Sequence, residues 1–224
     1  MNWPAMALTL KLAFVVCTTL LVIGLPIAYW LAYTRVRWKF LVESVVALPL
    51  VLPPTVLGFY VLVAMGPQSP FGRLYQSWIG HGLPFTFEGL VVGSVLYSLP
   101  FTVQPITAAF ALVDPTLINA SAMLGASKLR TFLRIILPLS VGGIVTALVL
   151  TFAHTLGEFG VVLMVGGDIP GVSQTISITI YDNVQALDYA TANHTSLVLL
   201  MLSFAILAIL FALKRRTGAG LADA

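Results

Sequence analysis

The chain has 224 residues, of which 59% are apolar and 8% are charged, and its formal net charge is +3. A soluble domain carries about a quarter charged residues, so this composition excludes an ordinary soluble enzyme, and with so few charges we expect no nucleic-acid partner. Apolar runs long enough to cross a bilayer recur along the whole length. They predict an all-α polytopic membrane protein with a single transmembrane domain over residues 1–224, in contact with membrane lipid.

Five segments are long and apolar enough to cross the membrane as helices. They run approximately from Leu8 to Tyr33, Leu41 to Met65, Leu90 to Val113, Leu139 to Val165 and Ser196 to Leu213. We expect the first to be a retained span, because it is longer than the apolar part of a signal peptide and no basic segment precedes it. Prolines lie inside the second and third spans, at Pro49, Pro53, Pro54, Pro100 and Pro105. They predict helices that are kinked or locally broken, as a transport path or ordinary packing would require.

The basic residues indicate the orientation, because short cytoplasmic loops retain Lys and Arg. Nine of the eleven follow the first, third or fifth span, namely Arg35, Arg37, Lys39, Lys128, Arg130, Arg134, Lys214, Arg215 and Arg216. Lys11 and Arg73 are the exceptions. The segment 166–194 contains aspartates but no Lys or Arg, which is typical of an external loop. We therefore expect the N-terminus outside the cell and the C-terminus in the cytoplasm.

The segment from Asp114 to Pro138, between the third and fourth spans, predicts a cytoplasmic elbow. Asp114 is suited to cap a helix with Pro115 at its first position, and Gly125 is expected to end that helix. A second helix is expected to begin near Ser127 and to turn its basic side chains toward water; these are Lys128, Arg130 and Arg134. Two short amphipathic helices that meet at a glycine suit docking into a groove on a cytoplasmic partner. An elbow that binds lipid headgroups through its basic residues is the alternative.

The elbow resembles the Glu-Ala-Ala loop of permease subunits of ATP-binding-cassette importers. The matching positions are Ala120, Gly125, Ile135, Leu137 and Pro138, whereas Asn119 replaces the glutamate and Ser121 the second alanine. The resemblance implies two ATPase subunits as partners and a coupling loop over residues 114–138. It places the ATPase-coupling contacts at Asn119, Ala120, Ser121, Leu124, Gly125, Ala126, Lys128 and Arg130.

Two further stretches are similar to oxyanion importer permeases of the molybdate, tungstate and sulfate type. They are the proline-rich segment from Glu43 to Gly66 and the segment from Thr155 to Val165, which contains Gly-Glu-Phe-Gly. The resemblance implies the type I importer permease fold in a bacterial or archaeal plasma membrane. It also implies a homodimer that forms a path for molybdate, with tungstate or sulfate as alternatives, and an extracytoplasmic molybdate-binding protein. The external segment from Gly66 to Glu88 could dock that protein, or its aromatic residues could form an interfacial belt.

Polar residues within the spans are candidates for the translocation path or gate. His154 and Glu158 are four residues apart, which on one helix places them within hydrogen-bond reach. They are expected either to line or gate a path or to fix helix packing, because ionisable groups inside a span are energetically expensive. Glu158 is more plausible as a gate or packing element than as an anion ligand, since like charges repel. Hydroxyls and amides suit the passage of an anion better, and Gln104, Thr151 and Thr155 supply them.

Other classes of function find little support in the sequence. The chain has no G-x4-G-K-[ST] phosphate-binding loop, so ATP hydrolysis is expected on a separate subunit. No His, Cys and Asp group has metal-ligand spacing, so we expect no metal, no cofactor and no catalytic residue. A stand-alone secondary transporter would predict an inverted repeat, and none is evident. An intramembrane enzyme would need a positioned nucleophile beside His154 and Glu158.

Overall fold

The computed structural model describes residues 2–219, without the side chains of residues 210 and 213–219. The described part contains helices and no strand, as the composition predicted. The helices are α1 (Trp3–Tyr33), α2 (Lys39–Val51), α3 (Pro54–Met65), α4 (Pro70–Ile79), α5 (Phe87–Ala111), α6 (Pro115–Met123), α7 (Lys128–Thr131), the π-helix η1 (Phe132–Ile136), α8 (Leu137–Leu139), α9 (Val141–Leu156), α10 (Gly160–Gly166), α11 (Ile176–Gln185) and α12 (Tyr189–Ala219).

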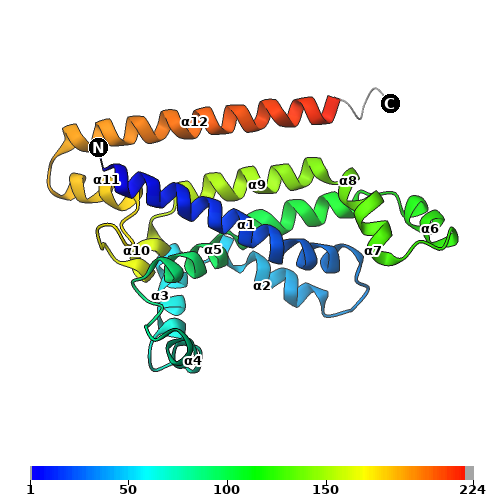
Figure 1. Cartoon of the computed structure of the whole chain (residues 1–224), viewed down its shortest axis with the longest axis horizontal. Coiled ribbons are helices and arrows are strands. Elements are labelled where there is room, and N and C mark those ends of the chain that lie inside the picture. Colours follow the sequence, from blue (N-terminus) through cyan, green and yellow to red (C-terminus); the bar gives the residue numbers. More distant parts are fainter. Residues whose placement is uncertain (1, 220–224) are drawn as a thin grey trace.

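The centre of the molecule is a bundle of α1, α5 and α9 (Figure 1). Helix α1 is apolar nearly all round, as expected in lipid, but only one stripe of it is buried. Leu12, Val16 and Leu20 recur at four-residue intervals on that stripe and pack with Leu90 of α5. Nearer the end of α1, Ala28 belongs to a second core with side chains of α5 and α9. These two cores hold the polar residues of α5 and α9 in fixed positions.

The second predicted span consists of two helices, α2 and α3, and its direction bends by 116° at the break between them. The break falls where the prolines predicted it. Neither Pro53 nor Pro54 can donate a backbone hydrogen bond, and Leu52 adopts the extended conformation, with ψ of 136°, that a residue before proline prefers. By contrast, α5 runs through Pro100 and Pro105 as one helix, so these prolines do not break the third span.

The prediction of one continuous helix from Leu139 to Val165 is wrong. Helix α9 ends at Leu156, residues 157–159 are not helical, and α10 begins at Gly160. A Cβ atom at Gly160 would lie 2.7 Å from Cβ of Pro54, and one at Gly58 would lie 2.7 Å from Cβ of Met164. These glycines allow α10 to turn away from α9 and pack closely against α3.

The described residues contain up to five helical segments long and apolar enough to be spans, if each bent pair of helices counts as one. Helices α1 and α5 and the part of α12 from Tyr189 to Ile209 are each long and apolar enough to cross a membrane. The pair α2 and α3 is one bent span, and the segment from Lys128 to Leu139 forms another with α9, at an angle of 69°. Figure 1 shows α12 along one side of the bundle, where little of it is buried.

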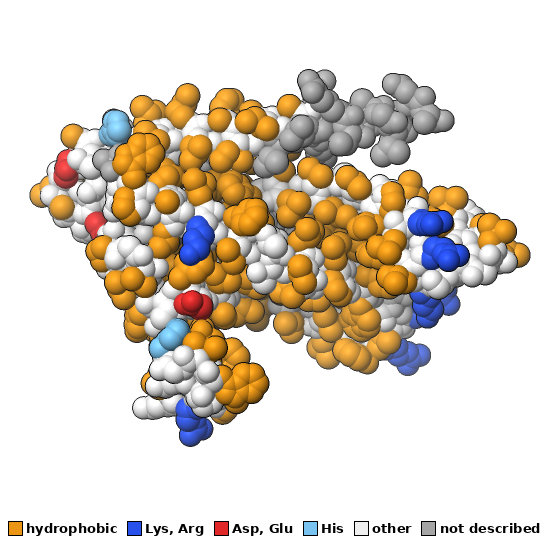
Figure 2. Space-filling model, viewed as in Figure 1, with side chains coloured by type: hydrophobic (Ala, Val, Ile, Leu, Met, Phe, Trp, Pro, Cys, Tyr) orange, Lys and Arg blue, Asp and Glu red, His pale blue; other side chains and the backbone are white. Residues whose placement is uncertain are grey.

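The charged side chains gather at the two ends of the molecule. Figure 2 shows most of the visible Lys and Arg side chains at the end that carries α6 and α7, and acidic side chains at the opposite end. This separation fits the expected distribution of charge across a membrane. The side chains of Lys214, Arg215 and Arg216, which also entered the orientation argument, lie outside the described residues.

Candidate functional site

The elbow consists of α6 and α7, the two helices that the sequence predicted. The backbone N–H of Thr116 donates to the Asp114 carboxylate at 2.8 Å, which caps α6. The Thr116 side chain, and then this backbone N–H, hold the pKa of the exposed Asp114 carboxyl below its usual value by hydrogen bonding. The helix ends in a Schellman motif, in which Ala126 N–H donates to the Ser121 carbonyl at 3.1 Å. Gly125 sits between the helices with φ of +77°, a conformation that other residues adopt only with strain.

A buried hydroxyl pair joins the two helices of the elbow. The Ser121 and Thr131 hydroxyls lie 2.8 Å apart, and both side chains are buried. Ser121 therefore occupies the inside of the elbow, although the sequence placed it among the ATPase contacts. Its departure from the family's alanine adds a hydrogen bond between α6 and α7.

The outer surface of the elbow is apolar at its tip. Met123 is 89% exposed and Leu124 is 87% exposed, directly before Gly125. Among the other predicted coupling residues, Ala126 is half-buried, and the exposed ones are Asn119, Ala120, Gly125, Lys128 and Arg130. Met123 is absent from the sequence-based set, although its place beside Leu124 could have identified it. Two adjacent apolar side chains with this exposure are typical of a surface that a partner covers.

A ladder of hydroxyl groups joins α5 to α9 inside the bundle. The Thr102 and Thr151 hydroxyls lie 2.6 Å apart, and the Ser98 and Thr155 hydroxyls lie 3.2 Å apart. Thr151 and Thr155, two candidates for the translocation path, are almost fully buried in this ladder. Their partners on α5 can be recognised in the sequence only when the register of the two helices is known.

His154 bonds across the same helix interface. Its Nδ1 atom lies 3.0 Å from the Ser98 hydroxyl, within hydrogen-bond distance. The imidazole stacks on Phe101, with 4.1 Å between ring centroids, and lies 4.6 Å from the ring of Tyr97. His154 is half-buried. Residues of α5 therefore hold its ring in place, through the contact of Ser98 with Nδ1 and the packing of the aromatic side chains against the imidazole.

Glu158 does not form the predicted hydrogen bond with His154. Helix α9 ends before Gly157, so the four-residue spacing no longer places the two side chains on one helix face. Glu158 is 4% exposed, and neither carboxylate oxygen has a hydrogen-bond partner among the described residues. The nearby α5 residue Ser94 likewise has a buried hydroxyl without such a partner. A buried carboxyl without a partner is unfavourable.

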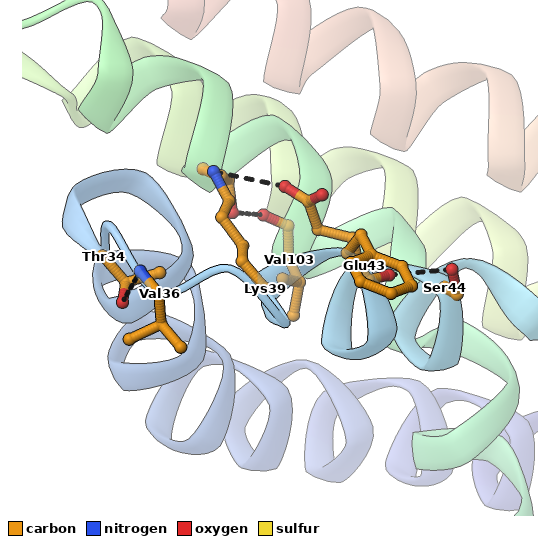
Figure 3. A network of polar contacts seen from close by, with 8 residues as sticks. Thr34, Val36, Lys39, Glu43, Ser44 and Val103 are labelled. Carbon is orange, nitrogen blue, oxygen red and sulfur yellow. Dashed lines mark hydrogen bonds and ion pairs between the residues drawn. The ribbon is translucent and has the colours of Figure 1, made fainter.

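Gln104 lies apart from this group. It lines a cavity of about 370 Å³ between α2 and α5, together with Glu43 and Thr107. The Glu43 carboxylate pairs with Lys39 one turn earlier at 3.3 Å (Figure 3). The predicted path residues therefore fall into two groups, one at the interface of α5 and α9 and one between α2 and α5.

Comparison with known proteins gives three results. The sequence model of a family described as "Binding-protein-dependent transport system inner membrane component" matches residues 24–218. The chain is 51% identical over 218 residues to the molybdenum transport system permease protein ModB of Azotobacter vinelandii, covering 97% of this chain and 96% of that protein. It is 37% identical over 184 residues to ModB of Escherichia coli strain K12, covering 82% of this chain and 80% of that protein.

Among solved structures, the fold is similar to a chain in the bacterial alginate ABC transporter in complex with alginate pentasaccharide-bound periplasmic protein. The TM-score is 0.78 at 20% sequence identity, and the match covers 95% of this chain and 78% of that chain. At this identity the similarity concerns the fold alone.

Proposed function

Since this chain belongs to the binding-protein-dependent transport system inner membrane component family, we propose that it is the membrane permease of an ATP-driven importer whose substrate is molybdate. The observation that carries the choice of substrate is the 51% identity, over nearly the whole chain, to a molybdenum transport permease. Tungstate and sulfate are the alternatives, because all three are tetrahedral dianions.

The elbow is the proposed contact with the ATPase. Met123 and Leu124 present an exposed apolar tip that would insert into a groove on that subunit. Asn119, Ala120, Gly125, Ala126, Lys128 and Arg130 surround the tip, and Ser121 supports it from inside. One elbow on each chain motivates two copies of the permease and two ATPases, with ATP hydrolysis on the ATPases.

The chain offers a direct route for movement from the elbow into the bundle. Helix α7 continues through η1 and α8 to α9 with Ser140 as the single residue between α8 and α9. The Ser140 hydroxyl donates to the Ala109 carbonyl of α5 at 3.4 Å. A rigid-body movement of the elbow would therefore act on the interface of α5 and α9.

The proposed gate lies at the far end of that interface. Thr151, His154 and Thr155 hold α9 against α5, and Glu158 follows at the break before α10. A carboxylate repels a dianion, so Glu158 would close the path and not bind the substrate. Gln104 is the proposed neutral donor on the open surface between α2 and α5.

The end opposite the elbow is the proposed extracytoplasmic side, with the N-terminus outside and the C-terminus in the cytoplasm. Asp168, Asp182 and Asp188 lie between the end of α10 and the start of α12, which Figure 1 shows at that end, whereas the basic side chains of α7 belong to the elbow. Helix α4 would dock the molybdate-binding protein there, and its exposed aromatic residues Phe71 and Trp78 support such a contact.

Competition experiments test the proposed substrate. Proteoliposomes would contain this chain, the ATPase and the binding protein, and uptake of radiolabelled molybdate would be measured with unlabelled tungstate or sulfate present. We expect uptake that tungstate reduces strongly and sulfate reduces little. Sulfate uptake that molybdate does not inhibit would identify a sulfate importer. Uptake by the chain alone along an anion gradient would favour a secondary transporter.

A further inference from the structure

A groove runs between α1 and the segment formed by α7 and η1. Its volume is about 470 Å³, and its apolar walls are Val22, Leu25 and Pro26 of α1 with Leu129 of α7 and Phe132 of η1. Val22 is 68% exposed and Leu129 is 66% exposed. The groove lies within about three turns of the end of α1.

Tyr29 and Lys128 connect this groove to a second, more polar cavity. That cavity has a volume of about 480 Å³ and includes Thr34 and Thr131 among its lining residues. The Tyr29 ring packs edge-on against Phe132 with 5.3 Å between centroids, which fixes the wall between the two spaces. The apolar groove therefore opens beside a cavity that also has polar lining residues, and Lys128 borders both.

Three cations of α7 and η1 form no ion pair among the described residues. Lys128, Arg130 and Arg134 are exposed within two turns of chain, and Arg130 and Arg134 line one shallow depression. Within residues 2–219, the ion pair recorded is Lys39 with Glu43, which leaves these three side chains without a carboxylate within 4 Å. The combination favours a ligand with an apolar body and an anionic head.

We propose that the groove binds an anionic phospholipid of the inner leaflet, with an acyl chain along Val22 and Leu25 and the phosphate at Lys128. A soluble anion would make no use of the apolar walls, and a zwitterionic lipid would gain less from three cations. The placement in the inner leaflet rests on the cytoplasmic position of the elbow proposed above. The site would tie the elbow to the membrane beside the surface that meets the ATPase.

Lipid retention by the purified full-length permease tests this proposal. The chain would be extracted from bilayers of phosphatidylglycerol and phosphatidylcholine, and bound lipid would be measured by native mass spectrometry. Lys128→Gln removes the cation, and Leu25→Trp fills the groove. Arg37→Gln is the matched control for charge on an exposed loop, and Leu96→Trp is the matched control for size on an exposed face of α5.

We expect the unmodified chain to retain phosphatidylglycerol over phosphatidylcholine, and Lys128→Gln and Leu25→Trp each to reduce that retention about fivefold. The two control variants should retain it unchanged. Equal retention in all variants, equal retention of both lipids, or displacement of the lipid by soluble glycerol phosphate would overturn the proposal. Loss of ATPase co-purification in Lys128→Gln with lipid retention intact would assign Lys128 to the ATPase instead. The measurement needs no transport, so its outcome is separate from that of the proposed function.

Discussion

At the scale of single residues, the buried polar groups of α5 and α9 have very different surroundings. The hydroxyl groups of Thr102 and Thr151 form a hydrogen bond with each other across the interface. By contrast, the carboxylate of Glu158 has no hydrogen-bond partner in the described residues. A satisfied pair stabilises one arrangement of two helices. An unsatisfied carboxyl raises the energy of the arrangement in which it occurs, which is the property expected of a group that operates a gate.

The hydrogen bond between Thr102 and Thr151 can be tested with a double-mutant cycle. Thr151→Val should lower the free energy of unfolding by about 1 kcal/mol, because the Thr102 hydroxyl is left buried without its partner. The double variant with Thr102→Val should recover part of that loss, because both polar groups are then removed. Thermal unfolding in detergent measures the cycle. Strictly additive losses would show that the two hydroxyls do not interact.

Gly125 leads to a prediction for coupling. Gly125→Val places a β-branched residue at φ of +77°, which costs about 1–2 kcal/mol locally and distorts the turn between α6 and α7. We expect ATP-driven uptake to fall several-fold while the permease remains folded. Gly142→Ala is the control, because outside its own helix none of the described atoms lies within 4 Å of its added Cβ. Unchanged uptake in Gly125→Val would refute a coupling role for this turn.

At the scale of elements, close packing of α3 against α10 determines where the fourth span bends. Gly160 and Gly58 allow the two helices to approach to a distance that a Cβ atom would prevent. Helical periodicity in the sequence does not reveal that approach, because the pattern of apolar residues is the same for one straight helix and for two helices with a break between them. The break is therefore a property of the packed pair.

A substitution at Gly160 tests this packing. Gly160→Ala should destabilise the protein by about 1–3 kcal/mol, because the new methyl group overlaps the Pro54 side chain. Gly142→Ala should leave stability unchanged or raise it by up to about 1 kcal/mol, as expected for an open position in a helix. Thermal unfolding compares the two variants. Equal stability of both would contradict the close contact between α3 and α10.

Helix α11 is connected to the N-terminus by amide and carboxylate groups. The Gln174 side chain accepts from Asn2 at 3.0 Å and donates to Asp168 at 2.7 Å and to Asp182 at 3.4 Å. Burial, and then the Asp168 carboxylate, raise the pKa of Asp182 above its ordinary value of 3.8. A raised carboxyl pKa favours folding while the group is protonated, and this contribution is lost as the pH rises through the folded-state pKa.

Asp182→Asn should therefore increase the Tm at neutral pH and reduce the fall in Tm between acidic and neutral pH. The neutral amide removes the repulsion from Asp168 and keeps an oxygen that can accept from Gln174. Differential scanning calorimetry at several pH values measures the effect. A lower Tm at neutral pH would show that the negative charge of Asp182 stabilises this end of the molecule.

At the scale of the whole molecule, the sequence predicted the helical class, the elbow and the spans other than the broken fourth one, because each depends on local patterns. Composition and length identify apolar spans, and Asp114, Gly125 and Ser127 occupy the capping positions that the elbow requires. The site was harder to predict. The partners of Thr151 and His154 depend on the register of α5 against α9, and the surroundings of Glu158 depend on the break after Leu156.

The molecule as a whole is a bundle whose exposed elbow continues directly into the helix that carries the proposed gate. Under the proposed function, this arrangement would make transport dependent on a partner that moves the elbow. It also predicts that this chain alone forms no open path for the anion.

Uptake of radiolabelled molybdate by proteoliposomes, with each component omitted in turn, tests this dependence most directly. We predict uptake only when this chain, the ATPase, the binding protein and ATP are all present, and its loss when Met123→Glu and Leu124→Glu place charges on the apolar tip. Uptake by the chain without the ATPase, or undiminished uptake with the charged tip, would contradict an importer driven through the elbow.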